Sequence, residues 1–192
     1  NLPIDSPVIT FKEKDLLYKQ CHDYLKQLGV SEHILKKAFN RALEAQDSFE
    51  KAIVDYNKQI IEEGKRKQQL IILLAGRPYH ADPLVQHKIS NMISAMGVHV
   101  ITDDIVRHQD IPLEGVNFLA QWAFTNRILK SAKWATQQGN HVQYMQLTSF
   151  GCGPDAFLID EIRALLKRCG KNLTLLKIDD ISNTGSIKLR VR

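Results

Sequence analysis

The chain has 192 residues, of which 44% are hydrophobic and 24% are charged, so it can bury a core and is not expected to be disordered. No apolar stretch is long enough to cross a bilayer, and no charged-then-apolar leader opens the chain, so neither a membrane partner nor secretion is predicted. Because the first residue is Asn1 and not Met, we expect a fragment of a longer multidomain protein.

The net charge of +5 is compatible with ligands that carry phosphate, such as nucleotides or coenzyme A. A dense basic stripe interleaved with aromatic residues is missing from the sequence, so no nucleic-acid partner is expected. The three cysteines, Cys21, Cys152 and Cys169, lie far apart and are odd in number. They form no disulfide framework, which predicts a reducing, cytoplasmic location.

Residues 1–68 are predicted to be helical. Apolar residues recur at helical spacing from Leu16 to Leu28, and Gly29 is a suitable stop. Ser31 can cap a second, longer helix whose apolar stripe runs to Ile60 and ends around Gly64. Two interpretations stay open: a helical hairpin that packs on the following domain, or an arm that pairs with another chain or domain.

Residues 69–192 are predicted to alternate strands and helices. The expected strands are 70–74, 98–101, 142–147 and 173–178, and the expected helices are 83–96, 117–137 and 156–169. Residues 70–74 are entirely apolar, as in a strand buried on both faces. The alternation predicts an α/β domain with a parallel, doubly wound sheet of flavodoxin or Rossmann type.

Polar segments follow each of the four predicted strands. They are residues 76–80, 102–104, 149–155 and 179–180. Because ligands bind at the carboxyl ends of the strands in such folds, we expect these segments to share one edge of the sheet.

Cys152 lies between two glycines in the segment 149–155, and Pro154 is well placed to begin the next helix. The positive end of that helix would favour a thiolate, which is a nucleophile or a metal ligand. Nucleophilic catalysis would need a histidine base, and His80 is predicted on the same edge. The alternative is an inert cysteine in a tight turn.

The same segment also fits a dinucleotide pattern, with Gly151, Gly153 and Ala156 between a strand and a helix. This signal is weak, since Pro154 removes a backbone donor and Asp155 places negative charge where a pyrophosphate would lie. The sequence contains no Gly-x-x-x-x-Gly-Lys-Ser/Thr loop, so no ATP site is predicted in it.

A second candidate segment runs from Gly76 to Pro83. Arg77 offers a planar fork for phosphate or carboxylate, and Tyr79 and His80 can donate hydrogen bonds. The alternative is a rigid turn. Three further residues complete the predicted ligand contacts: Asn126, Ser149 and Asp155.

Several motifs in this order resemble one family. The motifs at residues 74–80 and 149–155 occur together, and the segments 122–130, 176–180 and 187–190 fit the same family. Over roughly residues 70–192, the chain resembles the C-terminal part of acyl-CoA dehydratase activase-related proteins, also called CoA-substrate-specific enzyme activases.

The resemblance implies a cytoplasmic protein of anaerobic metabolism whose C-terminal region is similar to 2-hydroxyacyl-CoA dehydratase subunits, which hold a 4Fe–4S cluster. It implies Cys152 as a cluster ligand. A cluster needs several thiolates, and Cys152 alone has a suitable context here, so the other ligands would come from outside this sequence. We therefore expect the isolated fragment to be catalytically silent.

The predicted function is a dehydratase-subunit-like module that helps form an iron–sulfur cluster or an acyl-CoA site for ATP-driven electron transfer in 2-hydroxyacyl-CoA dehydration. The expected partners are other domains of the parent chain, a dehydratase subunit and acyl-CoA. Two alternatives remain. One is a metal-free nucleotide or CoA-binding module, in which Cys152 is a small residue in a glycine turn. The other is a scaffold whose helices dock a partner.

Overall fold

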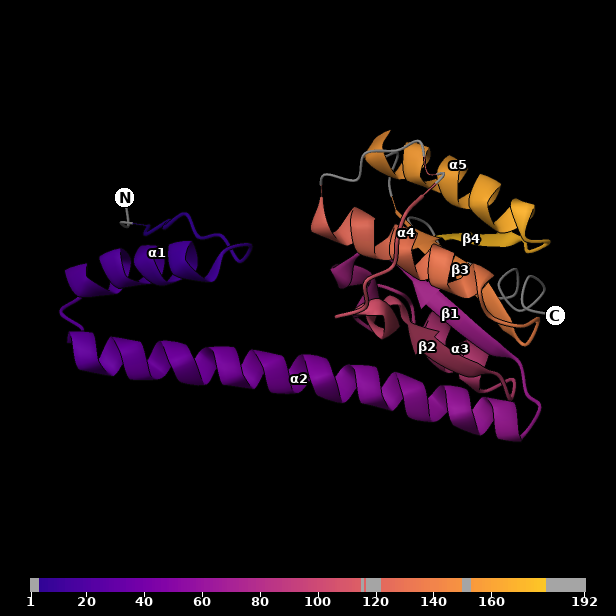
Figure 1. Cartoon of the computed structure of the whole chain (residues 1–192), viewed down its shortest axis with the longest axis horizontal. Helices are drawn as coiled ribbons and strands as arrows, with labels where there is room; N and C mark the ends of the chain where they lie inside the picture. The colour runs from indigo at the N-terminus through magenta and orange to yellow at the C-terminus, as the bar shows by residue number, and fades with distance from the viewer. Residues whose placement is uncertain (1–3, 115, 117–121, 150–152, 179–192) are drawn as a thin grey trace. The chain divides into compact units, whose positions relative to one another are not determined.

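A computed structural model describes residues 4–114, 116, 122–149 and 153–178 (Figure 1). The chain divides into two compact units, 1–51 and 52–192. The division falls inside α2 (Glu32–Arg66), a continuous helix of 35 residues. The division into sequence domains 1–68 and 69–192 stays a prediction.

The N-terminal unit is a helical hairpin made of α1 (Lys14–Gln27) and the first part of α2. The helix α1 ends as predicted, because Gly29 adopts a φ of 80° and the Val30 N–H returns to the Leu25 carbonyl. Across the hairpin, the rings of Tyr18 and Phe39 pack edge to face with centroids 5.0 Å apart. The two helices thus share a small apolar core of their own.

The C-terminal unit contains a four-stranded parallel sheet, which confirms the predicted α/β class. The strands are β1 (Ile71–Ala75), β2 (His99–Thr102), β3 (Val142–Thr148) and β4 (Leu173–Lys177). Their spatial order is β2-β1-β3-β4, and each neighbouring pair is parallel. Leu74 of β1 pairs with Thr102 on one side and Met145 on the other, so the carboxyl ends of these strands are level.

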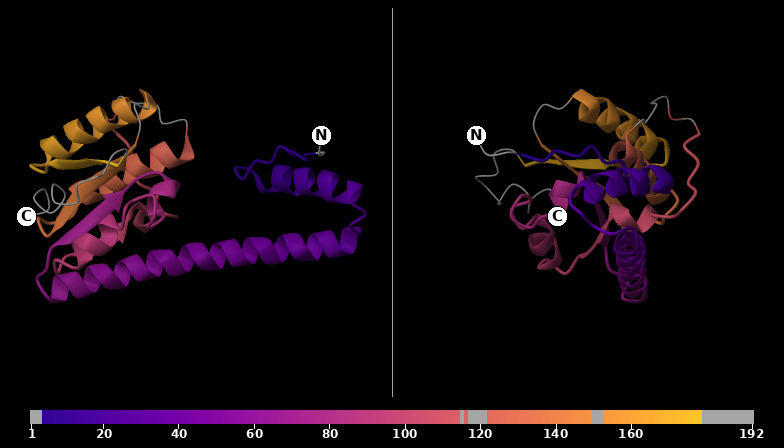
Figure 2. Two further views of the ribbon diagram at one scale, coloured as in Figure 1. Left: turned by 180° about the vertical axis from the view of Figure 1, so that it is seen from behind. Right: turned by 90° about the vertical axis from the view of Figure 1, so that its left-hand side faces the viewer.

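Helices cover both faces of the sheet, as in a doubly wound fold. The helices α4 (Ala123–Thr136) and α5 (Gly153–Arg168) lie side by side over one face (Figures 1 and 2). The core on that face includes Leu73, Leu129 and Ile162. The short helix α3 (Ile89–Ser94) packs on the opposite face, where Ile93 joins Leu74 in a second core.

The helix predicted over residues 83–96 is wrong in extent, since only Ile89–Ser94 forms an α-helix. The Asp82 carboxylate accepts hydrogen bonds from the N–H groups of Leu84 and Val85, at 2.8 and 3.1 Å. This is the arrangement of a helix N-cap, and it begins one turn, closed by the hydrogen bond from the Gln86 N–H to the Asp82 carbonyl at 3.0 Å. His87 and Lys88 then adopt positive φ, which prevents helical continuation. The helical spacing of apolar residues therefore predicted a helix over residues 83–88, where the backbone hydrogen bonds instead close turns.

The second part of α2 packs along the edge strand β2. The Asn57 side chain accepts a hydrogen bond from the Thr102 N–H at 2.8 Å, which occupies a donor on the open side of the sheet. Ile61 of the same helix joins the core beneath α4 and α5. At Gly64 the approach is so close that a Cβ would lie 2.7 Å from Cγ1 of the fully buried Ile71. Residues 52–66 are therefore part of the C-terminal unit.

Replacing Gly64 with alanine tests this packing. In an ordinary helix the change would stabilise by about 0.5–1 kcal/mol. Here the added methyl overlaps Ile71, which has no room to move, and we expect the free energy of unfolding to fall by about 1–3 kcal/mol. Urea denaturation measures it, with Glu62→Ala on the exposed side of the same helix as the control. A more stable Gly64→Ala protein would contradict the close approach.

Candidate functional site

The candidate site lies at the point where the strand order reverses. From β1 the chain crosses to β2 on one side, and it later crosses back over β1 to β3 on the other. In open parallel sheets the crevice between two such strands is where ligands bind, outside the carboxyl ends. The loops after Ala75 and Thr148 flank this crevice.

After β1 the chain folds back at Gly76 into a 3₁₀ turn, η1 (Pro78–Ala81). A Cβ at Gly76 would lie 2.7 Å from Nδ1 of His80, so only glycine allows the turn to close this tightly. The Arg77 N–H donates a hydrogen bond to that same Nδ1 at 3.0 Å. The turn thereby holds His80 in a buried position, with 3% of its surface exposed.

These contacts determine the tautomer of neutral His80, that is, which ring nitrogen carries the proton. A backbone N–H can only donate, so Nδ1 is the acceptor and the ring proton is on Nε2. His80 Nε2 then donates to Ser149 Oγ at 3.2 Å, and that oxygen is 3.3 Å from the Tyr79 hydroxyl. In this arrangement His80 cannot take a proton from Ser149. The three side chains therefore form a positioning cluster and not a serine–histidine nucleophile pair.

A buried ion pair joins the loop after β1 to the first turn of α5. Arg77 Nε lies 3.2 Å from Oδ1 of Asp155, and Nη2 of the same guanidinium contacts that oxygen as well. Asp155 is buried. Its carboxylate takes the place at the helix N-terminus that a pyrophosphate would need, and this argues against the dinucleotide pattern around Gly153.

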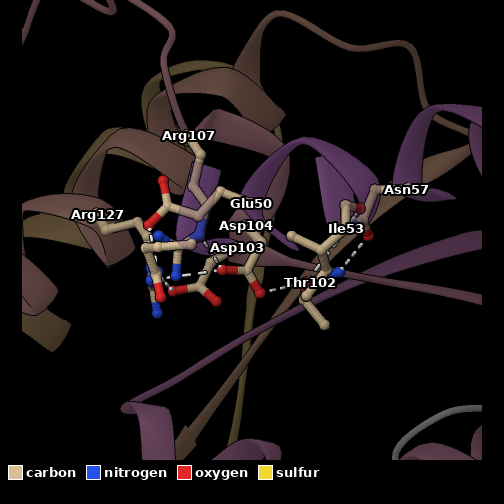
Figure 3. A network of polar contacts seen from close by, with 9 residues as sticks. Glu50, Ile53, Asn57, Thr102, Asp103, Asp104, Arg107 and Arg127 are labelled. Atoms are coloured by element: carbon tan, nitrogen blue, oxygen red, sulfur yellow. Dashed lines mark hydrogen bonds and ion pairs between the residues drawn. The ribbon is translucent and has the colours of Figure 1, made fainter. Parts of the chain in front are cut away.

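A second group of charges follows β2, in the 3₁₀ turn η2 (Asp103–Val106) (Figure 3). Arg127 of α4 binds Asp103 through Nε at 3.0 Å and lies 3.4 Å from Asp104. Asp104 is also held by Arg107 at 2.6 Å and by the Thr102 hydroxyl at 2.9 Å. The two adjacent carboxylates therefore have different environments.

Asp103 is the carboxyl whose ionisation is disfavoured. Burial, the largest cause, raises its pKa from 3.8 to about 6. The positive charge of Arg127 opposes this rise, and the negative charge of Asp104 adds to it.

A cavity of about 180 Å³ opens between the ends of β1 and β2. Its lining includes apolar side chains of the sheet and charged side chains of both ion-paired groups. The lining contains Leu74, Val100, Leu147, Arg77, Asp103 and Arg127. His80, Gln86 and Ser90 also line it.

The structure brings together five of the predicted ligand residues: Arg77, Tyr79, His80, Ser149 and Asp155. Asn126 makes no hydrogen bond to them, and within the part of the chain that the structure describes its buried side-chain oxygen has no hydrogen-bond partner. Cys152 lies outside the described residues, as do residues 179–180. The convergence predicted for the other three polar segments is confirmed as far as they are described.

Sequence reasoning placed Asp103 and Asp104 at the ligand edge of the sheet and Arg127 beside the candidate Asn126, but it did not include them among the predicted ligand contacts or predict that they pair with each other. Asp103 and Asp104 directly follow a predicted strand, and this was the available signal. Arg127 is one residue beyond the predicted Asn126, and a helix places neighbouring residues on different faces.

The described residues do not by themselves supply the ligands of an iron–sulfur cluster. In the ranges that the structure covers, no group of three or more His, Cys, Asp or Glu side chains could hold a metal ion. Cys21 is in the N-terminal unit, and Cys169 follows the last turn of α5, which runs from the carboxyl edge of the sheet to the opposite edge. A cluster at residue 152 would depend on thiolates from elsewhere.

A family profile described as CoA enzyme activase uncharacterised domain (DUF2229) matches residues 1–106, just over half of the chain. The chain belongs to this family. The resemblance to CoA enzyme activase-related proteins is thereby confirmed, and the match includes the N-terminal helices. No curated protein and no solved structure matches the chain.

The family match ends at Val106, the last residue of η2, so it includes β1, the loop after β1, β2 and η2. Arg127 and Asp155 of this CoA enzyme activase family member lie beyond it. As for the membrane, none of the helices in the described ranges combines the length and apolar character needed to span a bilayer.

The raised pKa of Asp103 predicts a pH effect on stability. Since the folded pKa of about 6 exceeds the unfolded value of 3.8, this group's stabilising contribution is present below pH 4 and is lost as the pH rises to 6. The loss is of the order of 3 kcal/mol. Asp103→Asn should remove it, so the difference in unfolding free energy between wild type and variant should change between pH 4 and 7 by this amount.

Urea denaturation at several pH values measures the difference, and the other carboxyl groups cancel because both proteins contain them. A difference that is constant from pH 4 to pH 7 would show that burial does not perturb Asp103.

Proposed function

We propose that this chain is a dehydratase-subunit-like module of a CoA-substrate-specific enzyme activase and that it contributes an acyl-CoA site for ATP-driven 2-hydroxyacyl-CoA dehydration. The observation that carries the proposal is the cluster of Arg77, Tyr79, His80, Ser149 and Asp155 at the crevice between β1 and β3. Membership of a CoA enzyme activase family supports the choice of CoA as the ligand.

The chemistry of the cluster residues favours binding and orientation over bond breaking. Tyr79 is half-exposed and presents its ring at the crevice, while its hydroxyl is within reach of Ser149. His80 accepts a hydrogen bond from the Arg77 N–H through Nδ1 and donates one from Nε2–H to Ser149 Oγ. The residues thus form a preorganised polar wall against which a thioester-bearing ligand would be oriented.

The proposal includes a role for Cys152 as one ligand of a 4Fe–4S cluster, with the other ligands supplied from outside this sequence. When bound, such a cluster supplies one-electron transfer. Cys152 directly precedes Gly153, the first residue of α5, and Asp155 of that helix contacts Arg77.

Acyl-CoA binding and cluster assembly can be tested separately. Isothermal titration with a 2-hydroxyacyl-CoA should show binding that Arg77→Met weakens by about tenfold or more, because a charged hydrogen-bonding group is lost from the wall. Arg163→Met, on the exposed surface of α5, is the control. Absence of binding to the wild type would refute the acyl-CoA proposal.

Anaerobic reconstitution with iron and sulfide, on the full-length parent and its Cys152→Ser variant, tests the cluster. Bound iron and visible charge-transfer absorption should fall in the variant. Equal iron in both proteins, together with retained acyl-CoA binding, would favour the metal-free CoA-binding alternative, in which Cys152 is only a small residue.

The docking alternative has support in the N-terminal unit, which exposes several large apolar side chains: Ile4, Val8, Phe11, Leu28, Ile34 and Phe49. Removal of residues 1–51 should abolish co-elution with a 2-hydroxyacyl-CoA dehydratase subunit in size-exclusion chromatography, while acyl-CoA binding persists. The deletion must end at residue 51, since a deletion to residue 68 would also remove Asn57 and Ile61 from the sheet. Unchanged co-elution would argue against docking by this unit.

A further inference from the structure

The cavity between the ends of β1 and β2 is too small for a whole coenzyme. Pockets for drug-sized ligands have about 300–1,000 Å³, whereas this cavity has about 180 Å³. It can therefore take only a slender part of a larger ligand whose remainder lies outside. The cavity shares Arg77 and His80 with the polar wall, so a ligand held at the wall could extend into it.

The charges that line the cavity balance. Arg77 and Arg127 are opposed by Asp103 and Asp104 in the lining itself. Each guanidinium already binds a carboxylate, Arg77 that of Asp155 and Arg127 that of Asp103. A phosphate group would need unopposed positive charge, and it would also meet the two carboxylates of η2. The lining therefore disfavours an anion.

The remaining surface of the cavity suits a neutral chain with amide groups. Leu74, Val100 and Leu147 provide apolar walls for methylene groups. The lining also contains carboxylate acceptors and guanidinium donors, which are the kinds of group that the N–H and the C=O of an amide bond to. The buried Gln86 side chain adds a donor group whose bond to the Ala81 carbonyl is long, at 3.4 Å.

We propose that this cavity receives the pantetheine arm of acyl-CoA, while the phosphates and the adenosine stay outside it. This inference rests on the proposed acyl-CoA function and adds which part of the ligand is recognised here. The arm is neutral, narrow and built from methylene groups and two amides, so it meets the limits of volume, charge balance and apolar walls together.

Titration of the full chain with pantetheine alone tests the assignment. Methyl groups of Leu74, Val100 and Leu147 should shift in ¹³C methyl NMR spectra, whereas adenosine 3′,5′-bisphosphate should leave them unchanged. Ser90 of α3 lines the cavity, and Ser90→Leu should weaken pantetheine and acyl-CoA binding by about tenfold or more, since inserted methyl groups occupy ligand space. Ser94→Leu, at an exposed position one turn later in α3, should not.

The outcomes separate the two proposals. If acyl-CoA binds but pantetheine moves none of the cavity methyls, or if the bisphosphate moves them, the pantetheine assignment is overturned and the acyl-CoA function stands. If acyl-CoA does not bind at all, both fail. Should Ser90→Leu not fold, the methyl shifts of the wild type still decide.

Discussion

The arrangement of the carboxyl edge depends on the buried ion pair between Arg77 and Asp155. It joins the loop after β1 to the helix after β3, and these are the two elements that flank the reversal of strand order. The Asp155 carboxylate is buried, and leaving it without its partner would cost free energy, whereas the Arg77 side chain keeps part of its surface in solvent. The pair therefore holds Arg77 at a fixed place, and the Arg77 backbone in turn fixes His80. The polar wall is a consequence of this one contact and of the tight turn that Gly76 allows.

The same ion pairs limit what the edge can bind. A crevice at the end of a parallel sheet, next to a helix N-terminus, usually attracts phosphate. Here Asp155 already neutralises the first turn of α5, and Asp103 and Asp104 neutralise Arg127. In this protein carboxylates of the chain itself bind the guanidinium groups that a phosphate-binding domain would leave available for phosphate. These internal ion pairs distinguish this edge from a dinucleotide site in the same kind of fold, and they are the reason that we propose a neutral part of a coenzyme as its ligand.

Most of the fold was predictable from the sequence because β1 is a uniform apolar run, the other strands are short segments rich in apolar residues, and the helices carry one apolar face. Residues 71–75 could hardly be other than a buried strand. The segment 83–88 could not be predicted from periodicity, since Asp82 and the positive φ of His87 and Lys88 decide its backbone. At the site, sequence order predicted which loops converge, but not which charges pair. The partners Arg77 and Asp155 are 78 positions apart, and only the sheet topology brings them together.

The family match covers only part of the site, because two of its charged residues lie after residue 106. Residues 1–106 supply the N-terminal hairpin, the edge-covering part of α2, the loop after β1, and η2 after β2. The charges that complete the edge, on Arg127 and Asp155, come from α4 and α5. Asp155 of α5 balances Arg77 in the loop after β1, and Arg127 of α4 balances Asp103 in the turn after β2. Asp104 is also bound by Arg107 of its own loop, so α4 and α5 complete a balance that this loop begins. The preference for a neutral ligand that we propose is therefore a property of the whole C-terminal unit, and it depends on the sheet placing these helices over the earlier loops.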